Sequence, residues 1–264
     1  MNGRRRLLGA LLGGLIARPR RAAAAADAHV VQRQEVRVGR TSLQLVVSER
    51  EPGGLTYVSL HENERTAVQA TRQLIDHQPG RLVELRSRGA RLVTFWLGAT
   101  PHVFDPNRIF TEVGVEKTLR HYSSYSREAQ SAIGPLRQAI LALLPARGEQ
   151  PLVAVHNNRA GTYSIAQYRA GGAYSTDAEI VFEAPGRSPG DFFLVTDRSW
   201  FERLRQASFS VVLQSRTPTD DGSLSVWFQQ RGLPYVNVEA RFGVVEEQYR
   251  MLRAVAGLAR GAGH

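Results

Sequence analysis

Hydrophobic and polar positions follow two patterns along the chain. Some segments alternate with a period of two residues, and others have apolar positions three or four residues apart. Val36-Arg37-Val38 and Leu43 to Val47 alternate on either side of Gly39-Arg40-Thr41, which predicts a β-hairpin. Short apolar runs predict strands at 55–60, 82–85, 91–97, 152–155, 192–195, 209–213 and 235–238. Apolar positions three and four apart predict helices at 64–77, 127–144, 199–206, 223–231 and 244–258.

Strands that alternate with helices are typical of an α/β domain. We therefore expect a mixed, largely parallel central sheet flanked by helices. Residues 98–125 contain two prolines and are predicted to be rich in loops. Residues 157–190 are predicted to form an excursion over the protein surface. The chain has 264 residues, 42% of them hydrophobic, and no repeat or linker divides it, so one domain over residues 29–264 is expected.

The first 28 residues have the pattern of an export signal. Arg4-Arg5-Arg6 precede an apolar stretch from Leu7 to Ala17, and an alanine run follows. That stretch is far shorter than the ~20 residues that span a bilayer, and no later segment is long and apolar enough. Paired arginines before two leucines are typical of twin-arginine signals, so we expect a periplasmic or secreted protein without a stable membrane span.

Charge and cysteine content limit the chemistry. Half of the net charge of +10 lies in the first 28 residues, and no basic run elsewhere is interleaved with aromatics. A basic protein without a polyanion partner is therefore favoured over one that binds nucleic acid or cell-wall polymers. The chain has no cysteine, which excludes disulfides and thiol catalysis, so any metal site must use His, Asp and Glu.

Chemically active residues follow three of the predicted strands. His61, His156 and Glu239 each come directly after an apolar run, and ligands of α/β sheets bind beyond the carboxyl ends of strands. Glu64 lies three residues after His61, a spacing that places both on one side of a helical turn. A buried Glu239 needs compensation, which a dication nearby would supply.

The loop Asp105-Pro106-Asn107-Arg108 can hold a carboxylate through the arginine fork and the asparagine amide. Taken alone, this loop is more simply a turn with a solvated arginine, and His156 alone is more simply a core histidine.

Together, four elements in this order resemble the zinc carboxypeptidase superfamily, including the carboxypeptidase A-like enzymes and the aspartoacylase/succinylglutamate desuccinylase branch. The resemblance extends from about residue 55 to 250. Its motifs are His61-x-x-Glu64, Asp105-x-Asn107-Arg108-x-Phe110, His156 after a strand, and Gly222-Ser223-x-Ser225-x-Trp227 followed by Gly232-x-Pro234-Tyr235 and Glu239-x-Arg241.

This resemblance implies a role for each matching residue. His61, Glu64 and His156 would bind one Zn²⁺ ion, and Asn107 and Arg108 would bind the terminal carboxylate of the substrate. Glu239 would act as general base, and Leu224 would line the pocket that selects the substrate's side chain. Two roles stay open. Arg88 and Arg91 are candidates for polarising the scissile carbonyl, and Tyr163, Tyr168 and Tyr174 for covering the substrate.

Three functions remain in competition. A peptidase that removes a C-terminal residue or cleaves cell-wall peptides is favoured by the expected export, and it needs an open groove. A deacylase of N-acyl amino acids, of aspartoacylase type, needs only a small closed pocket. A non-catalytic periplasmic binding domain on the same fold would hydrolyse no peptide.

Overall fold

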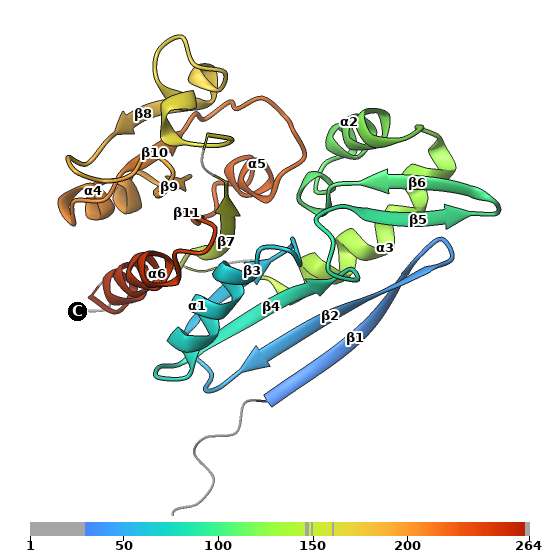
Figure 1. Ribbon diagram of the computed structural model, residues 1–264, viewed down its shortest axis with the longest axis horizontal. Coiled ribbons are helices and arrows are strands. Elements are labelled where there is room, and N and C mark those ends of the chain that lie inside the picture. The colour runs from blue at the N-terminus through green and yellow to red at the C-terminus, as the bar shows by residue number, and fades with distance from the viewer. Residues whose placement is uncertain (1–29, 146–147, 149, 160, 262–264) are drawn as a thin grey trace, which may run out of the picture.

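The fold is organised around a nine-stranded sheet with the strand order β1-β2-β4-β3-β7-β11-β9-β10-β8 (Figure 1). It was obtained as a computed structural model, which describes residues 30–145, 148, 150–159 and 161–261. The predicted export signal at 1–28 lies outside these residues. The strands are β1 Val30–Val38, β2 Thr41–Glu49, β3 Leu55–Ser59, β4 Gly80–Arg86, β7 Leu152–Asn158, β8 Ala178–Phe182, β9 Phe192–Val195, β10 Val211–Gln214 and β11 Tyr235–Arg241.

Six α-helices and a separate hairpin complete the described part of the chain. The hairpin consists of β5 Val93–Leu97 and β6 Thr100–Phe104. The helices are α1 Arg65–Ile75, α2 Glu112–Tyr122, α3 Arg127–Leu143, α4 Arg198–Gln206, α5 Leu224–Gln229 and α6 Val245–Arg260. No helix among the described residues has both the length and the apolar character that crossing a membrane requires.

The expected fold class is confirmed, with two corrections inside it, the first of which is that the segment 157–190, expected to run over the surface, contains β8 at the edge of the sheet. Strands β4, β3, β7 and β11 are parallel neighbours at the centre of the sheet, and antiparallel pairs join β2 to β4 and β9 to β11. The prediction of loops over 98–125 was wrong in part, because this segment contains β6 and α2. Strand β6 was obscured by Pro101, and α2 by a buried face in which Gly114 and Thr118 stand beside only two large apolar residues, Val115 and Leu119.

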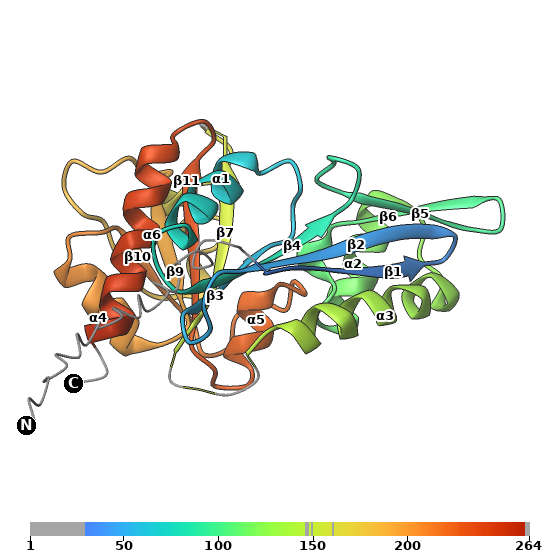
Figure 2. The ribbon, with the colours of Figure 1, turned by 90° about the horizontal axis from the view of Figure 1, so that it is seen from below.

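Helices cover the two faces of the sheet, and each face has its own core (Figure 2). On one face, α1, α4 and α6 pack over β3, β7 and β9 to β11 through residues such as Leu74, Phe201 and Leu252. On the other face, α2, α3, α5 and the β5–β6 hairpin form a second core that includes Ile133 and Phe228. The central strands are buried on both faces, as their nearly continuous apolar sequences predict.

Parallel pairing brings the ends of three strands to one edge. In the β7–β11 pair, His156 is the direct register partner of Glu239. In the β3–β7 pair, Val58 is the partner of Ala154, so the chain leaves β3 beside the end of β7 and continues to His61 and Glu64. The expectation that these strand ends meet is therefore confirmed by the register.

A close glycine contact fixes the loop of Asn107 and Arg108 to the segment before α5. The backbone N–H of Phe110 donates to the carbonyl oxygen of Gly222 at 2.9 Å. A Cβ atom on Gly114 would lie 2.1 Å from the Cα of Gly222, which itself has a φ of +79°. Both positions therefore require glycine, one for space and the other for its backbone conformation.

We predict that Gly114→Ala destabilises the protein by roughly 1–3 kcal/mol, because the added methyl group forces two backbones apart. Gly257→Ala is the matched control, since Gly257 also lies in a helix but a Cβ there meets nothing within 4 Å. The control should be stabilised by about 0.5–1 kcal/mol through helix propensity. Urea unfolding measures both, and equal free energies of unfolding for the two variants would contradict the packing argument.

Candidate functional site

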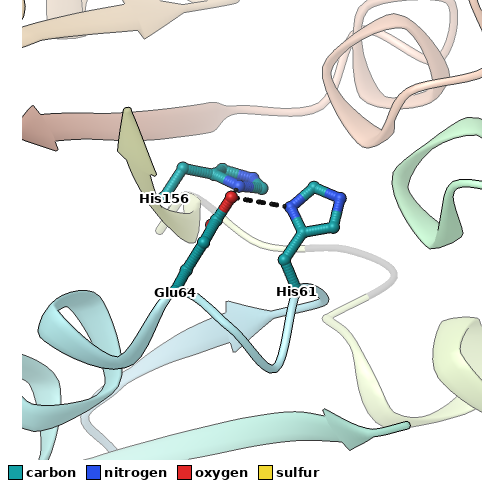
Figure 3. Close-up of side chains that lie close together, drawn as sticks. All are labelled: His61, Glu64 and His156. Carbon is teal, nitrogen blue, oxygen red and sulfur yellow. Dashed lines mark hydrogen bonds and ion pairs between the residues drawn. The ribbon is translucent and has the colours of Figure 1, made fainter. Parts of the chain in front are cut away.

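Two imidazoles and a carboxylate meet at the edge where β3 and β7 end. His61, Glu64 and His156 each offer one ligand atom, and these atoms all lie within 4.8 Å of one another. All three side chains are buried, and Figure 3 shows the Glu64 carboxylate pointing toward both rings. His61 follows β3, Glu64 is the N-cap residue of α1, and His156 belongs to β7.

The orientation of these atoms suits a shared cation. Nδ1 of His61 lies 3.0 Å from Oε1 of Glu64, yet it has no hydrogen-bond partner, so the two atoms are close without being aligned. The other oxygen of Glu64 lies 3.0 Å from Nδ1 of His156. A buried, unpaired ring nitrogen costs free energy unless a ligand occupies its lone pair. Two histidines with one glutamate form a donor set that zinc uses in catalytic sites.

Asp105 supports the first histidine from behind. Nε2 of His61 lies 2.8 Å from Oδ1 of Asp105, and the same oxygen accepts a hydrogen bond from the backbone N–H of Asn107. If Nε2 carries the proton, Nδ1 keeps its lone pair directed toward Glu64 and His156. Sequence reasoning quoted Asp105 only as part of a motif and gave it no role, because an Asp 44 residues from a histidine has no visible spacing signal.

Charge is strongly coupled within this group. Burial alone would lower the pKa of His61, but the carboxylates of Glu64 and Asp105 outweigh it and raise that pKa to about 9. Burial also opposes the ionised form of Glu64, yet the two imidazoles hold its pKa well below the ordinary range. Without a metal the site therefore keeps a proton on His61 at neutral pH, and a bound cation would replace it.

Of the two candidate arginines, the structure brings Arg91 to the site. Nη1 of Arg91 lies 2.5 Å from Oε1 of Glu64, and Nη2 lies 3.7 Å from Oδ2 of Asp105. Arg88 is exposed in the turn before β5 and does not line the cavity. Glu62 anchors this turn, because its Oε2 accepts hydrogen bonds from the backbone N–H groups of Ser87 and Gly89. The residue next to His61 thus holds the turn that carries Arg91.

Glu239 lies beside His156 on the neighbouring strand. Its oxygens accept hydrogen bonds from the Nδ2 groups of Asn237, at 3.1 Å, and Asn158, at 3.4 Å. Burial raises the pKa of Glu239, and the nearby His156 opposes this effect only in part. A carboxylate whose proton affinity is raised, in reach of a reacting group, has the properties of a general base.

A cavity of about 1060 Å³ connects these groups with the predicted carboxylate-binding pair. Asn107 and Arg108 lie in its wall, as do His61, Glu64, His156 and Glu239. Nη2 of Arg108 is 3.5 Å from Oδ2 of Asp221, and Oδ1 of Asn107 accepts the backbone N–H of Leu224. The asparagine carbonyl is thereby fixed, while the half-exposed Arg108 side chain borders the open space.

Leu224 requires a correction. Its side chain is fully buried in the core that α5 shares with α3 and the sheet, and it does not line the cavity. Leu224 and Phe228 are four residues apart and point to the same side of the helix, toward that core. Ser225 and Val226 form the cavity wall in its place.

All three candidate tyrosines line the same cavity, together with Tyr235. The hydroxyls of Tyr163 and Tyr168 form a hydrogen bond, and the ring of Tyr174 contacts both rings. Burial raises the pKa of Tyr163 and Tyr168, so both phenols stay neutral at pH 7. The structure therefore groups the candidate tyrosines and does not single one out.

Comparisons with known proteins give remote similarities. No known protein family and no curated protein matches the sequence. An aspartoacylase family protein from Mesorhizobium loti is similar in structure with a TM-score of 0.40 and 14% identity, over 90% of this chain and 71% of that one. A protein assigned as a carboxypeptidase from Burkholderia mallei gives a TM-score of 0.40 and 11% identity, over 87% of this chain and 64% of that one.

A third structure is assigned to the succinylglutamate desuccinylase/aspartoacylase family, from Shewanella amazonensis. It gives a TM-score of 0.39 and 11% identity, over 85% of this chain and 71% of that one. The chain spans about two thirds of the length of these proteins.

We predict that Asp105→Asn weakens metal binding by roughly 10- to 100-fold, because the His61 ring loses the charge that orients it. Asp76→Asn at the far end of α1 is the control, and its metal affinity should equal that of the wild type. Competition with a chromophoric chelator measures both affinities. A folded Asp105→Asn variant with wild-type affinity would remove Asp105 from the site.

Proposed function

We propose that this protein is a zinc-dependent hydrolase that cleaves an amide bond next to a free carboxylate. The observation that carries the proposal is the cluster of His61, Glu64 and His156, whose ligand atoms lie within 4.8 Å of one another beside Glu239. Arg108 borders the same cavity and can supply a counter-charge for a substrate carboxylate. Each of these residues has a separate task in such a reaction.

The residues present fit a zinc ion. His61, Glu64 and His156 would hold it, and Nδ1 of His61, which forms no hydrogen bond although Glu64 is 3.0 Å away, can serve as one of the ligand atoms. Zinc with three protein ligands acts as a Lewis acid and makes water a stronger nucleophile near neutral pH.

Glu239 takes the proton of the attacking water and passes it to the leaving amine. Asn237 and Asn158 hold its carboxylate in one orientation during both transfers. Arg91 is the best placed cation to stabilise negative charge on the carbonyl oxygen, because its guanidinium already lies against Glu64. Arg108 fixes the substrate by its carboxylate, so that the reacting atoms meet in register.

A peptide is favoured over a small N-acyl amino acid as substrate. The cavity of about 1060 Å³ is at the upper limit of the ~300–1,000 Å³ typical of small-molecule sites. Exposed residues of the 157–190 segment, such as Thr162 and Thr176, line its outer part. The twin-arginine pattern at 1–28 supports export. Peptides of the cell wall are available as substrates in the periplasm and outside the cell.

We predict that His61→Ala loses both zinc and activity, whereas Glu239→Gln keeps zinc and loses about 10²-fold or more in kcat. Metal content is measured by elemental analysis after zinc loading. Activity is measured on N-acyl dipeptides, cell-wall peptides and N-acetyl amino acids, which separates a peptidase from a deacylase. Equal zinc content in wild type and His61→Ala would refute the ligand assignment, and a zinc-loaded wild type that cleaves nothing would favour a binding domain.

A second prediction concerns pH. Glu239 works only when ionised, so activity should fall as pH drops through its raised pKa. Asn237→Ala removes a donor that favours the ionised form, so the acid limb of kcat should move to higher pH. Zinc content is measured at each pH, because protonated histidines also release metal. If the Asn237→Ala variant were slower at every pH but kept the wild-type acid limb, Asn237 would have no effect on the pKa of Glu239.

A further inference from the structure

Four amide side chains among the described residues of the cavity wall have an atom without a hydrogen-bond partner, and two of them, Gln214 and Asn237, lie on neighbouring parts of the sheet. Nε2 of Gln214 and Oδ1 of Asn237 have no hydrogen-bond partner, and both residues line the cavity. The Gln214 side chain is almost fully buried, with 3% exposed. The opposite end of the Asn237 amide is already fixed, because its Nδ2 donates to Glu239. Gln214 therefore offers an unused donor, and Asn237 an unused acceptor.

Sheet register places both groups on the same wall. Asn237 in β11 is the partner of Leu194 in β9, and Leu194 is the partner of Val212 in β10. Gln214 follows Val212 by two residues, so its side chain returns to the same face. Strand spacings of about 4.8 Å and a rise of about 3.3 Å per residue put the two Cα atoms roughly 12 Å apart. Leu194, on the strand between them, also lines the cavity, so a small planar group that lies over Leu194 would have one amide on each side.

The sheet is irregular beside Gln214. The register of the β8–β10 pair shifts between Leu213 and Gln214, where Gln214 pairs with Ala178 and Glu179 of β8 is left as the extra residue. Because the extra residue lies on β8, β10 keeps its alternation up to Gln214. The chain then leaves the sheet toward Pro218 and Thr219, which also line the cavity.

We propose that Gln214 and Asn237 select a substrate whose residue next to the cleaved bond has a carboxamide side chain, as glutamine or asparagine has. This proposal rests on the function proposed above, in which Arg108 binds the terminal carboxylate of the same substrate residue. A carboxamide has an acceptor for Gln214 and a donor for Asn237 on adjacent atoms. Ser225 and Tyr235 supply neutral polar surface around it.

Other side-chain classes fit less well. A carboxylate would face the acceptor of Asn237 and lie near Glu239 and Asp221. An ammonium group would leave the Gln214 donor unpaired, and an aliphatic group would leave both amides unpaired. Each buried polar group left without a partner weakens binding, and a site built for hydrogen bonds rejects an apolar analogue strongly.

Binding of non-hydrolysable analogues tests the proposal without turnover. Ketomethylene dipeptides, with CH₂ in place of the scissile N–H, end in glutamine, leucine, glutamate or lysine, each in both chiral forms. Their Kd values for the zinc-loaded protein are measured by calorimetry. The glutamine analogue of the preferred chirality should bind at least about 10-fold more tightly than the leucine analogue. Wild-type preference for leucine, glutamate or lysine, or no binding by any analogue, would overturn the proposal.

Variants of Gln214 assign the preference to this residue. Gln214→Leu should bring the glutamine and leucine analogues to within about 3-fold of each other, because the donor is gone. Gln214→Glu keeps the shape and exchanges the donor for an acceptor, so it should weaken glutamine binding and improve lysine binding. Gln206→Leu, at the exposed end of α4, is the matched control and should keep the wild-type ratio. An unchanged ratio in both Gln214 variants would overturn the assignment.

Failure of this proposal is distinguishable from failure of the proposed function. Hydrolysis of N-acyl dipeptides with the same four C-terminal residues is measured in parallel with binding. Hydrolysis without a preference for glutamine would overturn the selectivity and leave the hydrolase standing. Tight glutamine-analogue binding without hydrolysis of any substrate would support the pocket and contradict the hydrolase.

Discussion

Three buried carboxylates around two imidazoles are the constraint on which the rest of the structure depends. Glu64, Asp105 and Glu239 are all nearly inaccessible to water, and ionised groups are stable there only beside positive charge. Protonated His61 and the guanidinium of Arg91 supply part of that charge. A dication that replaces the His61 proton would supply more, beside Nδ1 of His61 and the Glu64 carboxylate. Electrostatics and the donor set therefore point to the same site for the same ion.

The sheet meets this constraint through register. Parallel β3, β7 and β11 end at one edge, so residues about 90 and 80 positions apart along the chain become neighbours. The helices hold the loops beyond that edge, and the contact of Gly114 with Gly222 ties the Arg108 loop to the start of α5. Strands β7 and β11 thus carry His156 and Glu239, while the loops and helix ends beyond the edge carry His61, Glu64 and Arg108.

Sequence patterns predicted the elements that create this edge, because buried strands and amphipathic helices have short-range periodicity. They predicted β3, β7 and β11, although His156 and Glu239 lie inside the last two strands rather than after them. They missed β6, which contains Pro101, α2, whose buried face includes Gly114 and Thr118, and β8 in the segment 157–190. Asp105 was given no role and Arg91 could not be separated from Arg88, since the contacts of Asp105 and Arg91 with His61 and Glu64 depend on how separate loops fold together. Leu224 was expected in the cavity wall but lies in the core, because a motif does not show which of several neighbouring helix residues, about 100° apart, faces the cavity.

Asn237 links the two halves of the cavity. Its Nδ2 donates to Glu239 and its Oδ1 faces the side-chain wall, so one planar amide contacts both the base and the selected group. Hydrogen bonds in a chain polarise one another. Under the proposed selectivity, a donor on Oδ1 strengthens the Nδ2–H bond to Glu239 and holds that carboxylate in its ionised form. A substrate that leaves Oδ1 unpaired then loses binding and also loses support for the base, so selection acts on the chemical step as well as on affinity.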